Sequence, residues 1–471
     1  MTRIELTING KTVSAPEGST ILEAARINGI EIPTLCAHDA LKPKAACKLC
    51  QVLVEGEEKE KLACATKVRE GMVVTTDSQE LFAKRKALIQ EMFRQHTVDC
   101  HHCLRIGSTK AEHFDPNVCE SCFFCDCVRD GFCELQSLAL QFGVDTLPFE
   151  VREHDFGIDC STGSVIRNMD KCIRCRRCVE VCQAQGVGIL GLQKRPNGQI
   201  VASKTDLMAD GCIRCGRCVD FCPTGALFMA EHKDEVVYFA HQYGTVTVAL
   251  LCPDVVAPLE ALYGARFSLG QVAAALKKIG IDHVFDPAGA QSVSRAQAVQ
   301  LLDARLGSVP LLLTDNYAAK NYLESRHPEL REQFAFYESV QKVFAGQMQK
   351  RYPGAKRIFV GAENSSGAEA KETGAVDIFL NPRELYRIFL RTGGAPAQRP
   401  ELPTEALPAA PSPDRYTELL SARGWSLKDS PEELCFEKDG RAFKALICRS
   451  LGQAKKAIEN PAGYDVIRLI G

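Results

Sequence analysis

Two runs of four cysteines share one spacing, forty residues apart. Each run reads C-x2-C-x2-C-x3-C, at 172–182 and at 212–222, and Pro223 follows the second run. Thiolates at this spacing hold [4Fe–4S] clusters, which carry single electrons, and the fourth cysteine of each run ligates the cluster of the other run. One cluster is therefore expected on Cys172, Cys175, Cys178 and Cys222, and the other on Cys212, Cys215, Cys218 and Cys182. Gln183 stands where the first run would often have proline.

Five arginines are interleaved with these cysteines. A [4Fe–4S] cluster on four thiolates is anionic, so a nearby guanidinium group should raise its reduction potential. The alternative for each arginine is a place on a solvated, charged surface. The arginines are Arg174, Arg176, Arg177, Arg214 and Arg217.

The cysteine count favours metal sites over disulfides. Of the 23 cysteines, 20 lie at or before Cys222. Grouping as C-x2-C is typical of metal sites, and disulfides are rare in reducing compartments. The formal net charge of −2 gives no indication of a nucleic-acid partner, and no run of 18 apolar residues predicts a membrane span. The opening MTRIELTINGK lacks the apolar segment of a secretory signal, so we expect a cytoplasmic protein.

The first 35 residues predict a small β-grasp domain. Apolar residues alternate over 4–8, Asn9-Gly10 is a two-residue hairpin signal, and a return strand follows. Ser19 is expected to cap a helix that carries apolar residues between 21 and 27. A second helix is expected over 79–96.

A cysteine loop follows the β-grasp pattern. Its spacing, C-x10-C-x2-C-x13-C, suits a [2Fe–2S] cluster, with zinc as the alternative, and the preceding fold pattern favours iron. The four ligands would be Cys36, Cys47, Cys50 and Cys64. The stretch EGSTILEAARINGIEIPTLC resembles the N-terminal ferredoxin domain of iron-only hydrogenases and of the large iron–sulfur subunit of respiratory complex I.

The resemblance implies a histidine-ligated [4Fe–4S] cluster in the segment from 96 to 133. Its relatives carry H-x3-C-x2-C-x5-C followed by LQ. Here HTVDC fits the start and CVRDGFCELQ the end, with about two dozen inserted residues between. The assignment that follows is His96, Cys100, Cys127 and Cys133.

The insertion leaves four further cysteines for a second site, namely Cys103, Cys119, Cys122 and Cys125. A closed site of four thiolates suits structural Zn²⁺, and the CxxCxxC order equally fits another [4Fe–4S] cluster. An exchange of Cys100 for Cys103 or Cys125 between the two sites stays open. The alternative zinc ligands are His101, His102 and His113.

The chain changes character after about residue 245. Apolar strands at 245–251 and 309–313 alternate with helical patterns at 269–279 and 296–306, which predicts α/β layering. The expected fold is α+β and multidomain. Its domains are a [2Fe–2S] β-grasp ferredoxin at 1–78, a histidine-ligated cluster domain with a cysteine-rich insertion at 79–158, a two-[4Fe–4S] ferredoxin at 159–244, and an α/β domain at 245–471 with a proline-rich, extended connection at 393–413.

The last domain resembles the catalytic domain of iron-only hydrogenases, through SLGQVAAALKKIGIDHVFDPAGA, VDIFLNPRELYRIF and FEKDGRAFKALICRSLGQAKKAIENPAGYDVIRLIG. In that family four cysteines hold the active-site cluster. The TSCCP-type segment corresponds here to Thr314–Ala318 and the PCxxKK-type segment to Gly361–Ser366, and neither contains cysteine. The sequence ends at Gly471, where the CxGGC segment would begin. We therefore expect no catalytic site, and a structural and docking role for this domain.

Four cysteines fit no motif. Cys160 is expected to be a free thiol, and Cys252, Cys435 and Cys448 are expected to be free, buried cysteines.

The resemblance implies an electron-relay iron–sulfur subunit of an NAD-linked, electron-bifurcating hydrogenase. Its implied partners are a flavoprotein subunit that holds FMN and binds NAD(H), a small [2Fe–2S] subunit, soluble ferredoxin, and a separate nickel–iron hydrogenase. The alternatives are the same relay in a formate dehydrogenase, a transhydrogenase or a complex I-like assembly, a hydrogenase with its own active site, and a metal-stabilised scaffold. The missing cysteines argue against the hydrogenase, and the mixture of cluster types against the scaffold.

Overall fold

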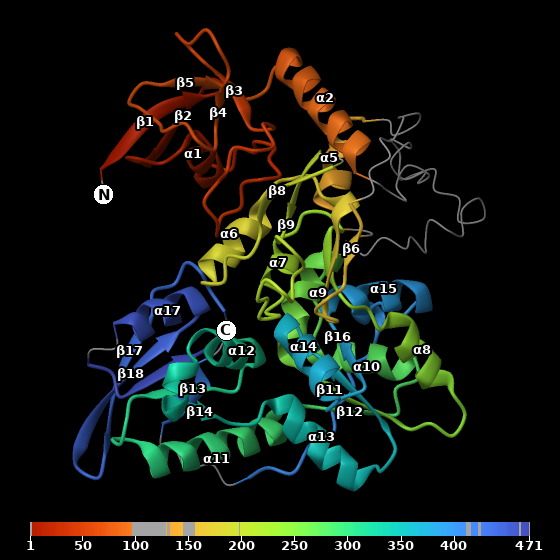
Figure 1. Ribbon diagram of the computed structural model, residues 1–471. Coiled ribbons are helices and arrows are strands. Elements are labelled where there is room, and N and C mark those ends of the chain that lie inside the picture. The colour runs from red at the N-terminus through yellow and green to blue at the C-terminus, as the bar shows by residue number, and fades with distance from the viewer. Residues whose placement is uncertain are drawn as a thin grey trace.

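The computed structural model describes residues 2–96, 129, 132–144, 156–196, 198–410, 416–422, 425–460 and 463–470. Figure 1 shows the N-terminal domain (red) at one end and the two sheets of the C-terminal domain side by side at the other, with the cysteine-bearing segments between them. None of the helices in these ranges combines the length and the apolar character needed to cross a membrane.

The N-terminal domain is a β-grasp fold, as predicted. Its five-stranded sheet has the order β2-β1-β5-β3-β4, with β1 and β5 parallel. Asn9 and Gly10 both have positive φ (50° and 77°), as a type I′ hairpin turn requires. The elements are β1 (Arg3–Ile8), β2 (Lys11–Pro16), α1 (Ile21–Ile27), β3 (Gln51–Val54), β4 (Lys61–Leu62) and β5 (Val73–Thr75).

The cap of α1 differs from the expectation by one residue. Thr20, not Ser19, is the N-cap, and it forms a capping box with Glu23. A capping box needs a glutamate or glutamine three residues after the cap, so that its side chain can accept from the backbone N–H of the cap. Thr20 has Glu23 at that position, whereas Ser19 has Leu22.

Helices α2 (Gln79–Gln95) and α5 (Glu134–Gln141) connect the β-grasp domain to the next cysteine-bearing segments and pack against each other (Figure 1). Ser78 caps α2, close to the predicted start, and α2 ends at the His96 cap. Arg85 in α2 is buried and donates to the backbone carbonyls of Leu49, Gln51 and Thr76, which fixes the helix to the domain before it.

The two cysteine runs form a small domain in which each run leads into a helix. An antiparallel sheet of order β10-β7-β6 and the hairpin β8-β9 complete it. The elements are β6 (Ile158–Asp159), β7 (Val165–Asn168), a 3-10 turn (Met169–Lys171), α6 (Arg177–Ala184), β8 (Gly191–Arg195), β9 (Gly198–Ala202), α7 (Arg217–Asp220) and β10 (Leu227–Met229).

The C-terminal domain contains two layered sheets. The first is parallel, of order β12-β11-β15-β16. Its faces are covered by α8, α9, α10 and α15 on one side and by α13, α14 and the start of α11 on the other. Its elements are α8 (Lys233–His241), β11 (Thr247–Leu251), α9 (Val256–Tyr263), α10 (Leu269–Lys278), β12 (His283–Phe285), α11 (Ala288–Arg305), α13 (Val340–Arg351), β15 (Lys356–Val360), α14 (Asn364–Thr373), β16 (Ile378–Leu380) and α15 (Pro382–Thr392).

The second sheet has the order β14-β13-β19-β18-β17, and only the β17–β18 hairpin is antiparallel. Helices α12 and α17 cover one face, while α16 and the second half of α11 cover the other. Both sheets therefore share α11. The elements are β13 (Leu311–Thr314), α12 (Tyr317–Arg326), β14 (Phe334–Phe336), α16 (Thr417–Ser421), β17 (Glu432–Lys438), β18 (Arg441–Cys448), α17 (Leu451–Glu459) and β19 (Val466–Leu469).

The described part of the proline-rich connection lies against the first sheet. A short 3-10 turn (Pro396–Gln398) precedes extended chain, and Glu405 forms a parallel bridge with Phe285 in β12. Leu407 is buried in the core beneath α13. Residues 411–413 lie outside the described residues.

The C-terminal domain fits closely against the two-run domain. Arg217 makes two hydrogen bonds to the Glu363 carboxylate, of 2.7 and 2.9 Å. At two positions the backbones approach so closely that only glycine fits. A Cβ on Gly216, whose φ is +69°, would overlap the side chain of Asn364, and a Cβ on Gly452 would overlap the carbonyl oxygen of Ala184.

Candidate iron–sulfur centres

The four cysteines of the first loop lie together in a buried site. Hydrogen bonds from the thiols of Cys47 and Cys64 lower the pKa of Cys36, and Cys64 also lowers that of Cys50. The N–H of Leu35 points at Cys47 Sγ, 3.4 Å away. These short sulfur–sulfur contacts and the N–H donor fit a small cluster held by four thiolates, such as [2Fe–2S].

The eight cysteines of the two runs lie close enough to influence one another's pKa values, both within the expected sets and between them, as Cys182 does for Cys178 and Cys178 for Cys218. Burial raises the pKa of the Cys175 thiol, and the neighbouring thiols of Cys178, Cys222 and Cys172 raise it further. Burial also raises the pKa of Cys215 to about 12, with further contributions from Cys212 and Cys182. The structure thus places the fourth cysteine of each run beside the other run.

Backbone conformation inside the two runs turns N–H groups toward sulfur. Arg174 and Arg176 in the first run have positive φ, and so do Arg214 and Gly216 in the second. The N–H of Arg174 lies 3.4 Å from Cys172 Sγ, and the N–H of Arg214 lies 3.4 Å from Cys212 Sγ. Donors aimed at ligand sulfurs favour the more reduced, more negative state of a cluster.

Arg167 is a further positive group that spacing did not predict. It is 1% exposed, its Nη2 lies 3.6 Å from Cys172 Sγ, and its Nε and Nη1 have no partner among the described residues. Burial alone would lower the pKa of Arg167, but the charges of Cys172, Cys178 and Cys222 outweigh it and raise the pKa. A buried guanidinium with unused donors fits an anionic [4Fe–4S] group at these cysteines. The only sequence signal is its place two residues after Val165, on the buried face of β7.

His96 and Cys133 are the members of the third expected set that lie within the described residues; Cys100 and Cys127 lie outside them, as do Cys103, Cys119, Cys122 and Cys125. Both described side chains are buried. Nδ1 of His96 donates to the carbonyl of Lys171 over 2.7 Å, immediately before Cys172. In that tautomer the lone pair is on Nε2, and a carbonyl partner at the other ring nitrogen is typical of metal-binding histidine.

A thiolate in place of His96 should keep a cluster but lower its reduction potential, because imidazole ligands raise cluster potentials relative to thiolates. We expect the His96→Cys variant to retain its iron and to show one cluster that titrates at a lower potential in EPR-monitored redox titration. Unchanged iron and unchanged potentials would show that His96 is not a ligand.

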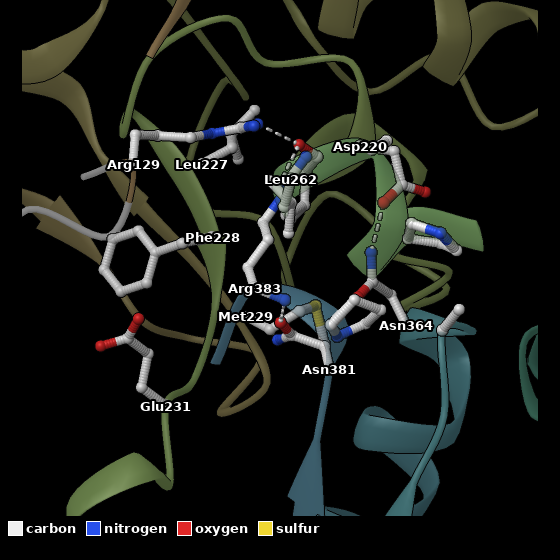
Figure 2. Close-up of a pocket in the computed structure, with 15 residues that line it drawn as sticks. Arg129, Asp220, Leu227, Phe228, Met229, Glu231, Leu262, Asn364, Asn381 and Arg383 are labelled. Carbon is white, nitrogen blue, oxygen red and sulfur yellow. Dashed lines mark hydrogen bonds between the residues drawn. The ribbon is translucent and has the colours of Figure 1, made fainter. Parts of the chain in front are cut away.

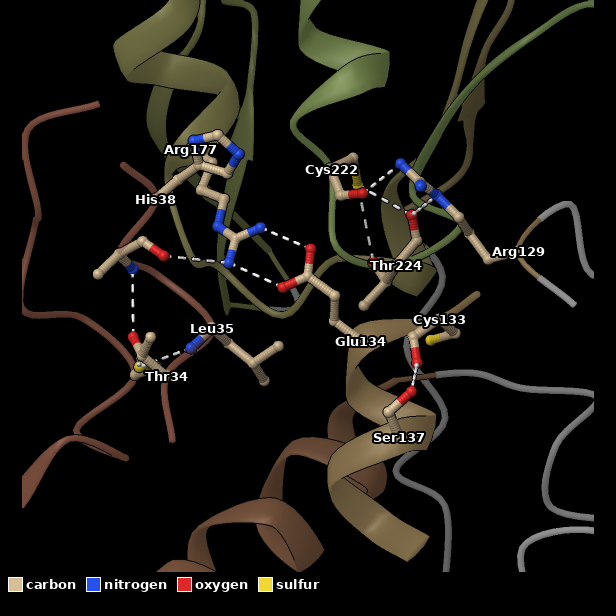
Figure 3. Close-up of polar contacts among 12 residues, drawn as sticks. Thr34, Leu35, His38, Arg129, Cys133, Glu134, Ser137, Arg177, Cys222 and Thr224 are labelled. Carbon is tan, nitrogen blue, oxygen red and sulfur yellow. Dashed lines mark hydrogen bonds and ion pairs between the residues drawn. The ribbon is translucent and has the colours of Figure 1, made fainter. Parts of the chain in front are cut away.

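Arg177 joins the segments of three expected centres (Figure 3). It is 4% exposed and pairs with both oxygens of Glu134, at 2.7 and 2.8 Å, and donates to the carbonyl of Ala37 at 3.2 Å. Ala37 follows Cys36, Glu134 follows Cys133, and Arg177 precedes Cys178. Two of the five arginines, Arg177 and Arg217, are therefore buried rather than solvated.

Two continuous apolar cores contain cysteines of different sets. Cys36, Cys47, Cys133 and Cys175 belong to one core, with α2 and α5. Cys178 and Cys222 belong to a second, against which Cys182, Cys212 and Cys218 pack. Protein rather than water therefore lies between neighbouring sets of cysteines.

A pocket of about 350 Å³ adjoins the Cys222 loop (Figure 2). Arg129 donates to the carbonyls of Val219, Thr224 and Cys222, and Arg383 lies 3.4 Å from that of Val219. Burial and the nearby Arg129 lower the pKa of Arg383 to about 10. These two arginines hold the backbone of the loop that carries Cys222.

The remaining cysteines agree with expectation except at two positions. Cys160 is exposed and forms no disulfide, and Cys448 is buried. Cys435, expected to be buried, is exposed, because its neighbours Leu434 and Phe436 in β17 pack against the core and Cys435 lies on the opposite face of the strand. Cys252 is half-buried and caps a 3-10 turn.

Family models match three parts of the chain. A 2Fe-2S iron–sulfur cluster binding domain matches residues 1–79, a 4Fe-4S dicluster domain matches 168–227, and the C-terminal domain of the iron-only hydrogenase large subunit matches 245–424. The predicted order of these three domains is thereby confirmed, as are [2Fe–2S] and [4Fe–4S] as the cluster types.

Curated relatives include subunits of hydrogenases and of NADH oxidoreductases. The chain is 33% identical to the NADP-reducing hydrogenase subunit HndD of Solidesulfovibrio fructosivorans, over 75% of this chain and 59% of the relative. It is 30% identical to an NADH-quinone oxidoreductase subunit of Rhizobium meliloti, over 56% and 28%. It is 28% identical to the gamma subunit of the NAD-reducing hydrogenase HoxS of Cupriavidus necator, over 39% and 68%.

The chain thus spans a little over half the length of the hydrogenase relative HndD and about a quarter of the NADH-quinone oxidoreductase relative. Among solved structures, a chain of an NAD⁺-reducing [NiFe]-hydrogenase matches at 25% identity with a TM-score of 0.37, over 48% of this chain and 87% of that one. An [FeFe]-hydrogenase matches at 17% identity with a TM-score of 0.40, over 51% and 82%. The resemblance to iron–sulfur subunits of NAD-linked hydrogenases and of complex I is confirmed by the curated relatives.

Proposed function

We propose that the chain is an electron-relay iron–sulfur subunit of a multisubunit, cytoplasmic, NAD(H)- and ferredoxin-linked hydrogenase that bifurcates electrons. Its partners would be a flavoprotein subunit holding FMN and binding NAD(H), a small [2Fe–2S] subunit, soluble ferredoxin, and hydrogenase subunits of the nickel–iron kind. The homologous subunits of NAD(P)-reducing hydrogenases support this proposal.

The observation that carries the proposal is the continuity of the cysteine sets. One apolar core contains cysteines expected to belong to three centres, and three cysteines of the fourth pack against the adjoining core, which contains Cys178 and Cys222. Iron–sulfur clusters supply reversible one-electron storage when bound. The chain's own residues would hold them in a fixed order and exclude water, while Arg167 and Arg177 place positive charge between them.

The ligand sets of the proposal are those expected from spacing. They are Cys36, Cys47, Cys50 and Cys64 for [2Fe–2S]; His96, Cys100, Cys127 and Cys133 for one [4Fe–4S]; and the two sets of the paired runs for two more. The insertion would hold Zn²⁺ or a fourth [4Fe–4S] cluster at Cys103, Cys119, Cys122 and Cys125.

The metal content tests these assignments directly. One [2Fe–2S] and three [4Fe–4S] clusters give about 14 iron atoms per chain. We expect this number in a fully loaded anaerobic preparation, with or without one zinc, by metal analysis and EPR spin quantification. Fewer than about ten iron atoms would remove at least one [4Fe–4S] assignment.

The partner subunits are tested by purifying the native complex. We expect a flavoprotein and nickel–iron hydrogenase subunits to co-purify with this chain. A formate dehydrogenase or transhydrogenase subunit in their place would assign the same relay to a different enzyme. The match to an iron-only hydrogenase domain at 245–424 favours a hydrogenase over complex I itself.

A further inference from the structure

We propose that the C-terminal domain binds a small organic monocarboxylate in a polar cavity between its two sheets, with Arg468 as the group that pairs with the carboxylate. This ligand site goes beyond the relay function and does not depend on it. The argument rests on the place of the cavity, on the helices that begin at it, and on the charges of its wall.

The cavity lies where ligands of α/β proteins usually bind. It has a volume of about 430 Å³ and is lined from both sheets by residues that follow the carboxyl ends of strands. Residues 252–254 follow β11, residues 315–317 follow β13, residues 339–341 follow β14, and residues 363–366 follow β15. In parallel sheets, this edge is the usual ligand position.

Three helices of ten residues or more begin at the cavity. The first residues of α12, α13 and α14 line it, and their caps are Asn316, Ser339 and Glu363. Asn316 and Ser339 accept hydrogen bonds from backbone N–H groups of their own helices, whereas Glu363 accepts only from the hydroxyl of Ser365 in α14 and leaves the first backbone N–H groups of that helix uncapped. Because a helix N-terminus carries partial positive charge, the three together favour an anion.

Arg468 is the second, independent observation. Its side chain lines the cavity and is 2% exposed. Neither Nε nor Nη1 has a hydrogen-bond partner within the ranges that the structure describes. A buried guanidinium with unused donors is costly, and an anion in the adjoining cavity would remove that cost.

None of the four carboxylates on the wall forms an ion pair or hydrogen bond with Arg468 among the described residues; two of them pair with other cations and two accept from neutral donors. The pairs are Asp254 with the N–H of Ala362, Asp315 with the hydroxyl of Tyr337, Glu363 with Arg217, and Glu369 with Lys342. Arg468 offers one positive charge close to several carboxylates, so a ligand with a single negative charge is favoured over one with two. A phosphate dianion would meet the wall's negative groups at close range.

The uncharged polar side chains of the cavity wall indicate which polar groups the ligand carries besides its carboxylate. Asn316, Ser365 and Ser366 supply an amide and hydroxyls along the segments where the resembling family carries cluster cysteines, and Gln341 adds an amide from α13. Such groups pair with hydroxyl or keto oxygens. A short hydroxy- or keto-monocarboxylate matches both the charge and the polarity, and we take pyruvate and L-lactate as probes.

The test measures binding to the anaerobic, cluster-loaded chain by calorimetry and thermal unfolding. Pyruvate or L-lactate should bind saturably and raise Tm, above the effect of sodium chloride at equal ionic strength. Arg468→Met should weaken binding roughly 10- to 100-fold, the range expected for loss of a charged hydrogen-bonding partner. Its own Tm without ligand should not fall, because the variant removes an unpaired buried charge.

Two further variants keep the result interpretable. Ser366→Phe should abolish binding by filling the cavity while Arg468 remains, so it serves if Arg468→Met fails to fold. Arg331→Met removes an exposed arginine and should bind as the parent does. The proposal is overturned if neither probe binds, if binding survives both cavity variants, or if inorganic phosphate binds more tightly than the carboxylates with the same dependence on Arg468. Iron content is a separate readout, so failure here leaves the relay assignment standing.

Discussion

Hydrogen should be neither evolved nor consumed by this chain alone, even after anaerobic maturation with the assembly machinery of iron-only hydrogenases. An active-site cluster of that family needs thiolate ligands. In this chain, the TSCCP-type and PCxxKK-type segments of that family correspond to Thr314–Ala318 and Gly361–Ser366. Neither segment contains a cysteine. They line a polar cavity instead. We expect methyl viologen-coupled hydrogen assays to stay at background.

The matched control is reduction of the same preparation. Dithionite or reduced ferredoxin should still bleach its visible absorption, because the relay cysteines lie outside the two segments. Robust hydrogen evolution by the single chain would overturn the assignment and make the chain a hydrogenase in its own right.

Replacing Arg177 with methionine should both destabilise the chain and shift the potentials of adjacent clusters. The change leaves Glu134 without its cation and the carbonyl of Ala37 without its donor. Since the Glu134 side chain is 46% exposed, water compensates for part of the loss, and we expect about 2 kcal/mol of lost stability. The guanidinium of Arg177 favours the more negative, reduced state of an anionic cluster, so its removal should lower the reduction potential by an amount on the order of tens of millivolts.

The control for Arg177 is Arg176→Met, which removes the same charge from the same loop. Arg176 is half-buried and its side chain is in no ion pair that the structure shows among the described residues. It should lower potentials without a comparable loss of unfolding free energy in urea. If Arg177→Met changes neither quantity, the junction between the three segments has no energetic role.

The parts of the structure that depend on local spacing were predictable. The hairpin at Asn9-Gly10 and the β-grasp domain follow from signals within a few residues. The ends of strands and helices were less predictable. The strand expected at 309–313 begins at Leu311, because Pro310 has no N–H for the ladder. The helix expected at 296–306 begins at Ala288, since its first half packs small residues such as Gly289 against Leu407 and shows no apolar stripe.

Groups that act across the chain could not be read from spacing. Arg167 lies only five residues before Cys172 but outside the cysteine run, in β7, while Arg177 meets partners 43 and 140 residues away. Arg468 reaches its cavity from the last strand. No local sequence pattern distinguishes these three arginines from other arginines, because their roles depend on which segments the fold brings together.

The glycine contacts at Gly216 and Gly452 have a consequence for how such a protein can change. Two surfaces that meet without room for one methyl group cannot slide, hinge or accept a substitute partner. Cutting the chain near residue 244 would uncover the backbone of Ala184 and leave Arg217 without Glu363, beside the cysteines of the second run. Under the proposed relay function, the C-terminal domain would act as a support that keeps the second cysteine run in a fixed position.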